Sequence, residues 1–312
     1  MRTRLNWLEV AALCTALLSP LFTANAQPWP RPPPPNKDEF SVMEYNLWRF
    51  SYEDRDRDGQ KDNFKPEDQI AALITTITNA NPDILAIEEI GDGDSFEILK
   101  TRLNAAGMGY TDFEYFVVTN ATIGLGSCRA SPSWRAIISR TNPTRLAQKK
   151  VPVSRGYLCV DIQVNPNYTF RLFVAHLKSK LYTPLGQTEM RRNEARLLNK
   201  HVRRAVNHNK DLNILVVGDM NDTITSAPLR DLIGVPKYLN DLRPTDFVGD
   251  VWTHDWAYQE QYSRINYVFA NDAMLPEVVA EKCYIPREPL AKVASDHRPI
   301  FTVFKAYDRK SE

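Results

Sequence analysis

Residues 82–89 have the sequence PDILAIEE, an apolar run between a proline and two glutamates. A short continuous apolar run bounded in this way is typical of a strand buried on both faces. Glu89 follows the run directly, so its carboxylate is expected at the carboxyl end of the strand. In α/β proteins the ligand crevice lies outside these strand ends. The stretch therefore predicts both an α/β fold and a candidate functional residue.

Four other segments repeat this arrangement of polar residues at the end of an apolar run. A single carboxylate or amide after a strand is usually a turn former or a helix cap. Five such ends in one chain instead favour a shared crevice, because neighbouring strand ends meet at one edge of a sheet. The four segments are Glu44-Tyr45-Asn46, Ala175-His176-Leu177-Lys178, Gly218-Asp219-Met220-Asn221 and Ser295-Asp296-His297.

Short apolar runs alternate with longer stretches of helical period, which places helices against the faces of sheets. The domain is expected to span residues 39–308, with a tail at residues 309–312, and we expect a monomer. The candidate helices are residues 66–79, 95–105, 188–207 and 227–232. The candidate strands are residues 41–47, 84–88, 114–118, 135–139, 158–164, 170–175, 214–217, 265–269 and 300–304.

The first 38 residues are expected to precede the domain. Arg2 and Arg4 come before an apolar run, and Ala24-Asn25-Ala26 follows it, so residues 1–26 are predicted to be a cleaved signal peptide. A membrane anchor is the alternative, but Pro20 breaks the run, which is shorter than the ~20 residues of a spanning helix. Residues 27–38 read as a proline-rich spacer. We expect a secreted or periplasmic protein without a transmembrane segment in the mature chain.

The net charge and the number of cysteines exclude few classes of function. Without residues 1–26 the chain has 37 basic and 37 acidic residues, so bulk charge gives no sign of a nucleic-acid partner. The mature chain would keep Cys128, Cys159 and Cys283, which allow at most one internal disulfide. Three buried or free thiols are an equally good interpretation. No cysteine or histidine pair has the spacing of a structural zinc site.

The order Asn46, Glu89, His176, Gly-Asp-x-Asn and Ser-Asp-His resembles the endonuclease/exonuclease/phosphatase superfamily, the fold group of pancreatic-type deoxyribonuclease. Residues 82–89, 135–140 and 262–269 are also similar to that family, and the resemblance extends from residue 42 to about residue 302. It implies a four-layer sandwich of two packed mixed β-sheets flanked by helices. It also implies cleavage of phosphodiester bonds by in-line attack of water with a divalent metal, Mg²⁺ or Mn²⁺.

The resemblance gives a role to each carboxylate and amide. Glu89 is the expected metal ligand, with Asn46 and Asp296 in or near the coordination shell. Asp219 is expected to orient or help activate the attacking water. Asn221 is expected to donate its amide to a phosphate oxygen.

The histidines carry the expected proton transfers. His297 is the candidate general base, because imidazole titrates near working pH, and His176 would stabilise the phosphorane or protonate the leaving oxygen. Family members usually carry an aspartate that hydrogen bonds the catalytic histidine, whereas this chain has Asn266. An asparagine oxygen accepts the imidazole N–H but supplies no charge. Since the same change in serine proteases lowers turnover ~10⁴-fold, we hypothesise a slowed enzyme.

Residues 54–62, with the sequence DRDRDGQKD, match the first nine positions of a D-x-D-x-D-G calcium loop. The calcium ligands would be Asp54, Asp56, Asp58 and Asp62. Position twelve is Lys65 in place of the usual bidentate glutamate, and the interleaved arginines weaken the negative field. A solvated loop without calcium is the alternative.

The sequence leaves the phosphodiester substrate open. Nucleic acid is the first choice because residues 176–178 resemble the nuclease branch, and phosphoinositide, sphingomyelin or a small phosphoester are the alternatives. A lipid-acting enzyme should expose an aromatic hairpin or a basic amphipathic face, and the sequence shows neither clearly. Trp252, Trp256 and Tyr258 are expected in an aromatic core, with a substrate pocket as the alternative. A different class of protein, which binds metal and phosphate without turnover because of Asn266, is the competing hypothesis.

Overall fold

The computed structural model describes residues 31–118, 121–127, 144–146, 149–151, 153–287 and 289–309. The predicted signal peptide, the candidate strand at residues 135–139 and Cys128 lie outside the described residues. Cys159 and Cys283 both carry free thiols. Among the described residues, no helix combines the length and apolar character needed to cross a membrane.

Two five-stranded mixed sheets form the centre of the domain. In the first, of order β14-β1-β2-β4-β3, strand β1 runs parallel to β2 and antiparallel to β14. Its strands are β1 (Glu39–Phe50), β2 (Ile84–Ile90), β3 (Asp112–Val118), β4 (Ala121–Ser127) and β14 (Ile300–Lys305). The sequence did not indicate β4, whose two glycines weaken the strand pattern.

The second sheet has the order β10-β13-β9-β8-β7, with β8 parallel to β9 and the other pairs antiparallel. Its strands are β7 (Tyr157–Asn165), β8 (Tyr168–His176), β9 (Asn213–Asp219), β10 (Asn240–Asp241) and β13 (Asn266–Ala270). Two short hairpins complete the strands: β5 (Thr144–Leu146) with β6 (Lys149–Val151), and β11 (His254–Trp256) with β12 (Gln261–Ser263).

The four predicted helices are present, with bounds shifted by one or two residues. Asp92 begins α3 by accepting a hydrogen bond from the backbone N–H of Ser95 at 3.0 Å, and Ser226 caps α5 in the same way. A short α6 was not predicted. The helices are α2 (Glu67–Ala80), α3 (Gly93–Ala105), α4 (Gln187–His208), α5 (Ala227–Ile233) and α6 (Ala291–Ala294).

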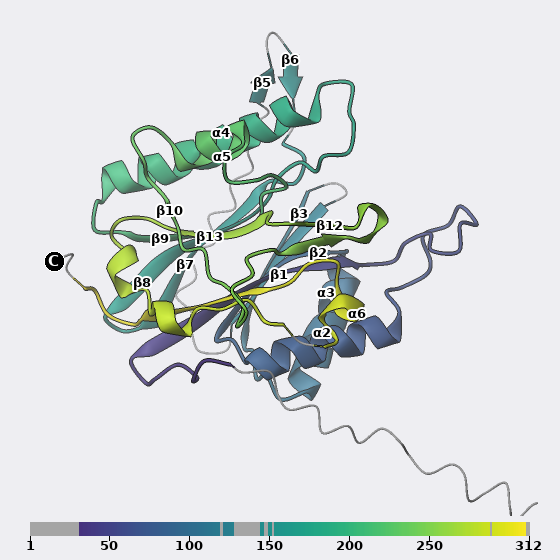
Figure 1. Cartoon of the computed structure of the whole chain (residues 1–312), viewed down its shortest axis with the longest axis horizontal. Coiled ribbons are helices and arrows are strands. Elements are labelled where there is room, and N and C mark those ends of the chain that lie inside the picture. Colours follow the sequence, from purple (N-terminus) through teal and green to yellow (C-terminus); the bar gives the residue numbers. More distant parts are fainter. Residues whose placement is uncertain are drawn as a thin grey trace, which may run out of the picture. The chain divides into compact units, whose positions relative to one another are not determined.

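Three apolar cores separate four layers, as Figure 1 shows for the sheets and their flanking helices. Alternate residues of one strand face different cores: Val42 packs between the two sheets, whereas Met43 packs against α2 and α3. The third core joins the second sheet to α4 and α5. The predicted four-layer sandwich of two mixed sheets flanked by helices is confirmed.

The last residues of the predicted spacer lie against the domain. Lys282 donates a hydrogen bond to the carbonyl oxygen of Pro34 at 3.0 Å, and the same ammonium group pairs with Glu39 at 2.7 Å. Both Lys282 and Glu39 are buried. The proline-rich segment is therefore anchored at its domain end by a buried ion pair.

Candidate active site

The strand ends of both sheets meet and bring the predicted site residues together. Asn46 lies in β1, and its side-chain nitrogen donates to Glu89 at the end of β2 (3.3 Å) and to Asp219 at the end of β9 (3.2 Å). His176 ends β8 and its Nε2 lies 3.4 Å from the Asp219 carboxylate. His297 reaches the same carboxylate from the segment before β14, with its Nε2 at 3.8 Å. Asp219 is thus the centre of the cluster.

Left-handed backbone conformations concentrate around this cluster. Trp48, Arg49, Glu89 and Asn221 have φ angles of 47°, 54°, 58° and 53°, which non-glycine residues rarely adopt. The first two lie where the pairing of β1 with β2 shifts register. The irregular backbone lets the Arg49 N–H donate to the Glu89 carboxylate at 3.0 Å. Such strain, held by the surrounding sheets, is typical of functional sites.

Gly218 lets the two catalytic strand ends approach closely. A side chain at this position would place its Cβ 1.9 Å from the Ala175 carbonyl oxygen, and the residue has a φ of +132°. Because β8 and β9 pair in parallel register here, His176 lies opposite Asp219. The glycine of the Gly-Asp-x-Asn motif is therefore required by the packing of β9 on β8.

The loops after the strands are also fixed by hydrogen bonds. The Asn221 backbone N–H donates to Asp219 at 2.8 Å, and its side-chain amide donates one hydrogen to the Leu177 carbonyl at 3.0 Å. No described residue accepts the second amide hydrogen of Asn221. Buried Glu194 of α4 accepts the backbone N–H of Lys178 at 2.6 Å, which holds the segment after His176.

A buried hydrogen-bond chain runs from His297 into the space between the sheets. His297 Nδ1 lies 2.7 Å from the Asn266 side-chain oxygen, and the Asn266 amide nitrogen donates to Glu44 at 2.7 Å. Glu44 is accompanied by Glu88, and both are completely buried. Both Glu88 oxygens and one Glu44 oxygen have no hydrogen-bond partner among the described residues, so burial favours the neutral form of each carboxyl group. Burial raises the pKa of Glu44 to about 8, and burial and the Glu44 charge raise that of Glu88.

Burial also shifts the proton affinities of the residues at the centre. It raises the pKa of Asp219 to about 7 and that of Asp296 to about 7, and in both cases the nearby Glu89 charge raises it further. Burial lowers the pKa of His176 and His297 well below the usual value, so both imidazoles are neutral at pH 7. The site therefore holds neutral imidazoles beside carboxylates that form no ion pair with any lysine or arginine in the described part of the chain.

The residues fit a hard divalent cation. Asp296 has one buried carboxylate oxygen with no hydrogen-bond partner among the described residues, and Glu89 lies close enough to raise its pKa. Carboxylate oxygens are preferred ligands of Mg²⁺ and Mn²⁺. The Asn46 oxygen accepts the Trp48 backbone N–H at 2.9 Å, while its nitrogen holds two carboxylates. This geometry favours a positioning role for Asn46 in such a metal site.

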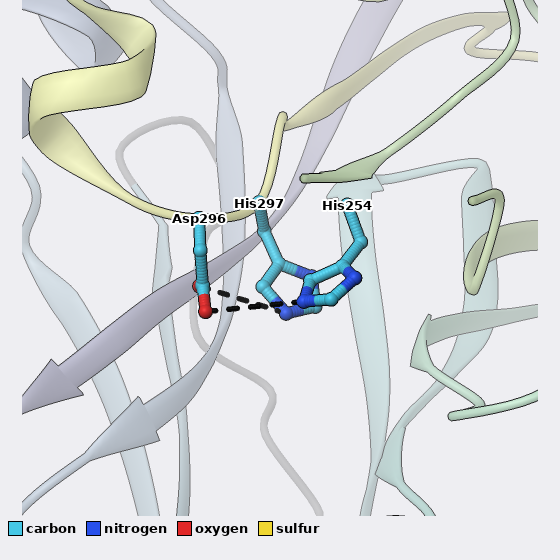
Figure 2. Close-up of side chains that lie close together, drawn as sticks. All are labelled: His254, Asp296 and His297. Atoms are coloured by element: carbon cyan, nitrogen blue, oxygen red, sulfur yellow. Dashed lines mark ion pairs between the residues drawn. The ribbon is translucent and has the colours of Figure 1, made fainter. Parts of the chain in front are cut away.

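Two further residues at the site were missed by sequence reasoning. His254 Nε2 lies 3.9 Å from Asp296, and its ring centre is 4.6 Å from that of His297 (Figure 2). Lys65 is buried and donates to the Trp48 carbonyl at 3.0 Å; burial lowers its pKa to about 8. Neither residue follows a predicted strand, so no local pattern marks them as site residues.

A cleft of about 660 Å³ opens beside the cluster. Glu89 and His176 of the cluster line it, together with three basic residues, Arg49, Lys61 and Arg155. Arg155 is held by a hydrogen bond to the Leu177 carbonyl at 2.7 Å. The other polar residues of the lining are Ser51, Tyr52, Glu53, Asp92, Ser95 and Ser179.

The hairpin formed by β11 and β12 exposes aromatic side chains directly after His254. Trp256 is 44% exposed, Tyr258 is 90% exposed and Tyr262 is 51% exposed. The expectation that Trp256 and Tyr258 belong to an aromatic core is therefore wrong. Trp252 does pack, with the Arg298 guanidinium over its ring at 4.2 Å. The structure therefore has the exposed aromatic hairpin that is expected of a lipid-acting enzyme, which the sequence did not show clearly.

The predicted calcium loop brings three of its four carboxylates together. Ligand oxygens of Asp54, Asp56 and Asp58 lie within 4.8 Å of one another, and Asp62 is outside this group. The backbone N–H of Gly59 donates to Asp54 at 3.2 Å. Lys65, at the twelfth position, points away from the loop toward Trp48. Calcium binding by this loop stays a prediction.

The sequence profile of the Endonuclease/Exonuclease/phosphatase family matches residues 43–297. The chain belongs to this family. The match spans all five polar segments of the site. Members of the family are hydrolases that act on phosphoester bonds, and the chain is a hydrolase of this class.

Solved structures of the same family share the fold at low sequence identity. The catalytic domain of human Nocturnin with bound sulfate anion has a TM-score of 0.59 and 16% identity, covering 86% of this chain and 95% of its own. An endonuclease/exonuclease/phosphatase from Bacteroides vulgatus gives 0.58 and 16%, covering 86% and 100%. D. rerio TDP2 complexed with single strand DNA product gives 0.56 and 16%, covering 86% and 99%. No curated protein matches this chain in sequence.

Proposed function

We propose that this family member is an exported, metal-dependent phosphodiesterase that cleaves its substrate by in-line attack of water. The observation that carries the proposal is the convergence of Glu89, Asp219 and Asp296 on two neutral, buried histidines. Clustered buried and half-buried carboxylates that pair with no described lysine or arginine, beside neutral imidazoles, suit metal-assisted hydrolysis. Export rests on the predicted signal peptide at residues 1–26.

A divalent cation held by Glu89 and Asp296 would neutralise charge that develops on the phosphoryl oxygens. His297 donates its Nδ1 hydrogen to Asn266, which leaves the Nε2 lone pair to accept a proton from the attacking water. Asp219 lies 3.8 Å from that Nε2 and orients the water. The second amide hydrogen of Asn221 is directed to a phosphate oxygen.

His176 is the candidate for the leaving-group side. Its Nε2 lies 3.4 Å from Asp219 and 3.9 Å from Glu89. Because burial keeps the imidazole neutral, it acts as a hydrogen-bond donor to the developing oxyanion. His176 also lines the cleft beside the cluster, where the departing part of the substrate would lie.

Nucleic acid is the first proposed substrate. The basic residues Arg49, Lys61 and Arg155 in the cleft suit a phosphate backbone, and exposed Trp256 and Tyr258 suit stacking of unpaired bases. A related fold, D. rerio TDP2, was solved with a single strand DNA product. For substrate binding, the charges that line the cleft therefore matter more than the near-neutral net charge of the whole chain.

A phospholipid is the second candidate, because the exposed aromatic hairpin also suits insertion into a membrane interface. The two substrates are distinguished by replacing Trp256 and Tyr258 with alanine. Reduced cleavage of phosphoinositide or sphingomyelin vesicles, with unchanged plasmid cleavage, would select the lipid. Reduced cleavage of single-stranded DNA, with no turnover of vesicles, would select nucleic acid.

The enzyme itself is tested by hydrolysis of a chromogenic phosphodiester and of plasmid DNA by the mature protein with Mg²⁺, Mn²⁺ or EDTA. Glu89→Gln should lower metal-dependent turnover at least ~100-fold, because it removes the charge that holds the cation. Exposed Glu97→Gln is the matched control and should be active. Absence of turnover on every substrate, with metal and phosphate still bound, would favour the binding-protein hypothesis centred on Asn266.

A further inference from the structure

Two imidazoles and one carboxylate converge at one edge of the site (Figure 2). His254 Nε2 lies 3.9 Å from one Asp296 oxygen, and His297 Nε2 lies 3.8 Å from the other. One ligand atom from each of the three residues lies within 4.8 Å of the other two. Three protein ligands of this type, with a fourth position left to water, are typical of Zn²⁺ sites.

Each histidine is already oriented by its other ring nitrogen. His297 Nδ1 lies 2.7 Å from the Asn266 oxygen, and His254 Nδ1 lies 3.5 Å from the Ser263 hydroxyl. Metal-binding histidines characteristically donate their second ring N–H to such an oxygen, which fixes the tautomer. The Asn266 oxygen can only accept, so His297 keeps its Nε2 lone pair toward Asp296. The Ser263 hydroxyl can accept from or donate to His254 Nδ1, and a metal at His254 Nε2 would select the tautomer in which the hydroxyl accepts.

The backbone holds the three residues in place. The segments containing His254 and His297 form an antiparallel bridge, and the Asp255 N–H donates to the Asp296 carbonyl at 2.8 Å. On the other side the Arg298 N–H donates to the Thr253 carbonyl at 2.7 Å. A cation would therefore meet ligands whose main chain is already ordered, which lowers the entropic cost of binding.

We propose that His254, Asp296 and His297 form a binding site for a divalent transition metal such as Zn²⁺, distinct from the Mg²⁺ or Mn²⁺ position at Glu89. Imidazole selects Zn²⁺, Co²⁺ and related ions, whereas a carboxylate-rich position selects Mg²⁺. The two positions share Asp296, so they compete for one carboxylate. A transition metal also takes the His297 Nε2 lone pair.

Inhibition follows from this competition and rests on the proposed function, because that lone pair accepts the proton of the attacking water. Zn²⁺ should therefore inhibit turnover supported by Mg²⁺. Metal binding itself does not depend on the proposed function. The two statements can fail separately, so they are measured separately.

Binding is tested by titrating the metal-free protein with Co²⁺ alone and recording visible absorption, with Zn²⁺ calorimetry in parallel. We expect the spectrum of a low-coordinate Co²⁺ ion with nitrogen ligands, and at least ~100-fold weaker binding in His254→Phe, since loss of an outer hydrogen-bond partner alone costs up to ~100-fold. His201→Phe, which changes a half-buried histidine packed on Tyr157, is the matched control and should bind normally. His254→Gln serves if His254→Phe does not fold.

Glu89→Gln separates the two metal positions. Co²⁺ binding that survives Glu89→Gln and is weakened by His254→Phe supports the site. Binding that is lost in Glu89→Gln, or unchanged in both His254 variants, overturns it. In the activity assay, Zn²⁺ inhibition should be weaker in His254→Gln than in the native protein. If the native protein shows no turnover at all, the proposed function fails while the Co²⁺ result still decides the metal site.

Discussion

At the scale of single residues, Asn266 and Glu44 form a matched pair. The Asn266 oxygen faces the His297 N–H, and its amide nitrogen donates to Glu44, although 222 residues separate Asn266 from Glu44. An aspartate at position 266 would set a third carboxylate beside Glu44 and Glu88, which are both completely buried. Asparagine suits this position because its amide nitrogen donates to Glu44 without adding a buried charge. Its oxygen then accepts from His297 Nδ1, which keeps the imidazole in the tautomer with its proton on Nδ1.

This pairing changes how the slowed-enzyme hypothesis is tested. Asn266→Asp alone should destabilise the fold, because it adds a buried charge, so its turnover mixes two effects. When Asn266→Asp is combined with Glu44→Gln, the new side-chain amide at position 44 can donate a hydrogen bond to the new carboxylate at position 266. We expect the double variant to raise turnover at least ~10-fold, on the scale of the ~10⁴-fold loss known for the reverse change in serine proteases. Turnover is measured with the chromogenic phosphodiester.

Glu44→Gln alone is the control for that experiment and should not raise turnover. A double variant that folds as well as the native protein and shows unchanged turnover would mean that Asn266 does not limit the reaction. A single Asn266→Asp variant that is both stable and faster would contradict the proposed conflict with Glu44.

At the scale of elements, the parallel pair β8 and β9 depends on Gly218. Gly218→Ala should lower the free energy of unfolding by ~3 kcal/mol or more, because the new Cβ would overlap the Ala175 carbonyl oxygen. Gly109→Ala is the matched control, since Gly109 also has a positive φ of +62° but has nothing within 4 Å of an added Cβ. Urea unfolding of both variants measures the difference in unfolding free energy. Equal losses in the two variants would show that the positive φ, and not the overlap of the added Cβ with Ala175, causes the destabilisation.

The acidic loop at residues 54–62 is a separate element with its own prediction. Asp54, Asp56 and Asp58 lie together, but Lys65 supplies no carboxylate at position twelve, so any calcium affinity should be weak, with a Kd of ~10⁻⁴–10⁻³ M. Calorimetric titration with Ca²⁺ and the shift in Tm measure it. Asp56→Asn should remove the response, and exposed Asp211→Asn should keep it. Neither heat nor stabilisation in the native protein would end the hypothesis.

At the scale of the whole molecule, the buried acid pair makes stability depend on pH. Burial raises the folded pKa of Glu44 from 4.5 to about 8, so its contribution is complete below pH 4.5 and is lost as pH rises toward 8. Above pH 6.5 His176 and His297 oppose this trend only weakly, because most of the proton loss from unfolded histidine, with its ordinary pKa of 6.5, lies at or below that pH. Asp219 and Asp296, whose folded pKa values are also raised, to about 7, act in the same direction as Glu44. In EDTA the free energy of unfolding should fall by on the order of 2 kcal/mol between pH 6.5 and pH 8.

Denaturant unfolding at several pH values measures this slope. Glu44→Gln should make it shallower, and Glu97→Gln, at an exposed position, should leave it unchanged. A slope that is the same in the native protein and in Glu44→Gln would assign the pH dependence to other groups. The measurement is made in EDTA because a bound cation would itself stabilise ionised carboxylates.

Much of the fold could be predicted from local patterns. The apolar runs at residues 84–88 and 214–217 predicted buried strands, and the helical periods predicted α2 to α5, because burial and amphipathicity leave a repeat in the sequence. The glycine-containing β4 and the short β11–β12 hairpin were missed because their residues carry no strong period. Five polar segments were expected to meet, and the structure brings them together around Asp219. The expectation that each of them ends a strand is wrong for two: Asn46 lies inside β1, and residues 295–297 lie between α6 and β14.

By itself, the sequence determined the α/β class, the main elements and the family, because each rests on residues that are neighbours in the chain. Only the tertiary structure decided that His254 and Lys65 join the site, that Trp256 and Tyr258 are exposed, and that Asn266 is paired with Glu44. These features depend on contacts between distant segments of the chain. Their physical cause is packing, which brings together charges and hydrogen-bond partners that no local pattern relates.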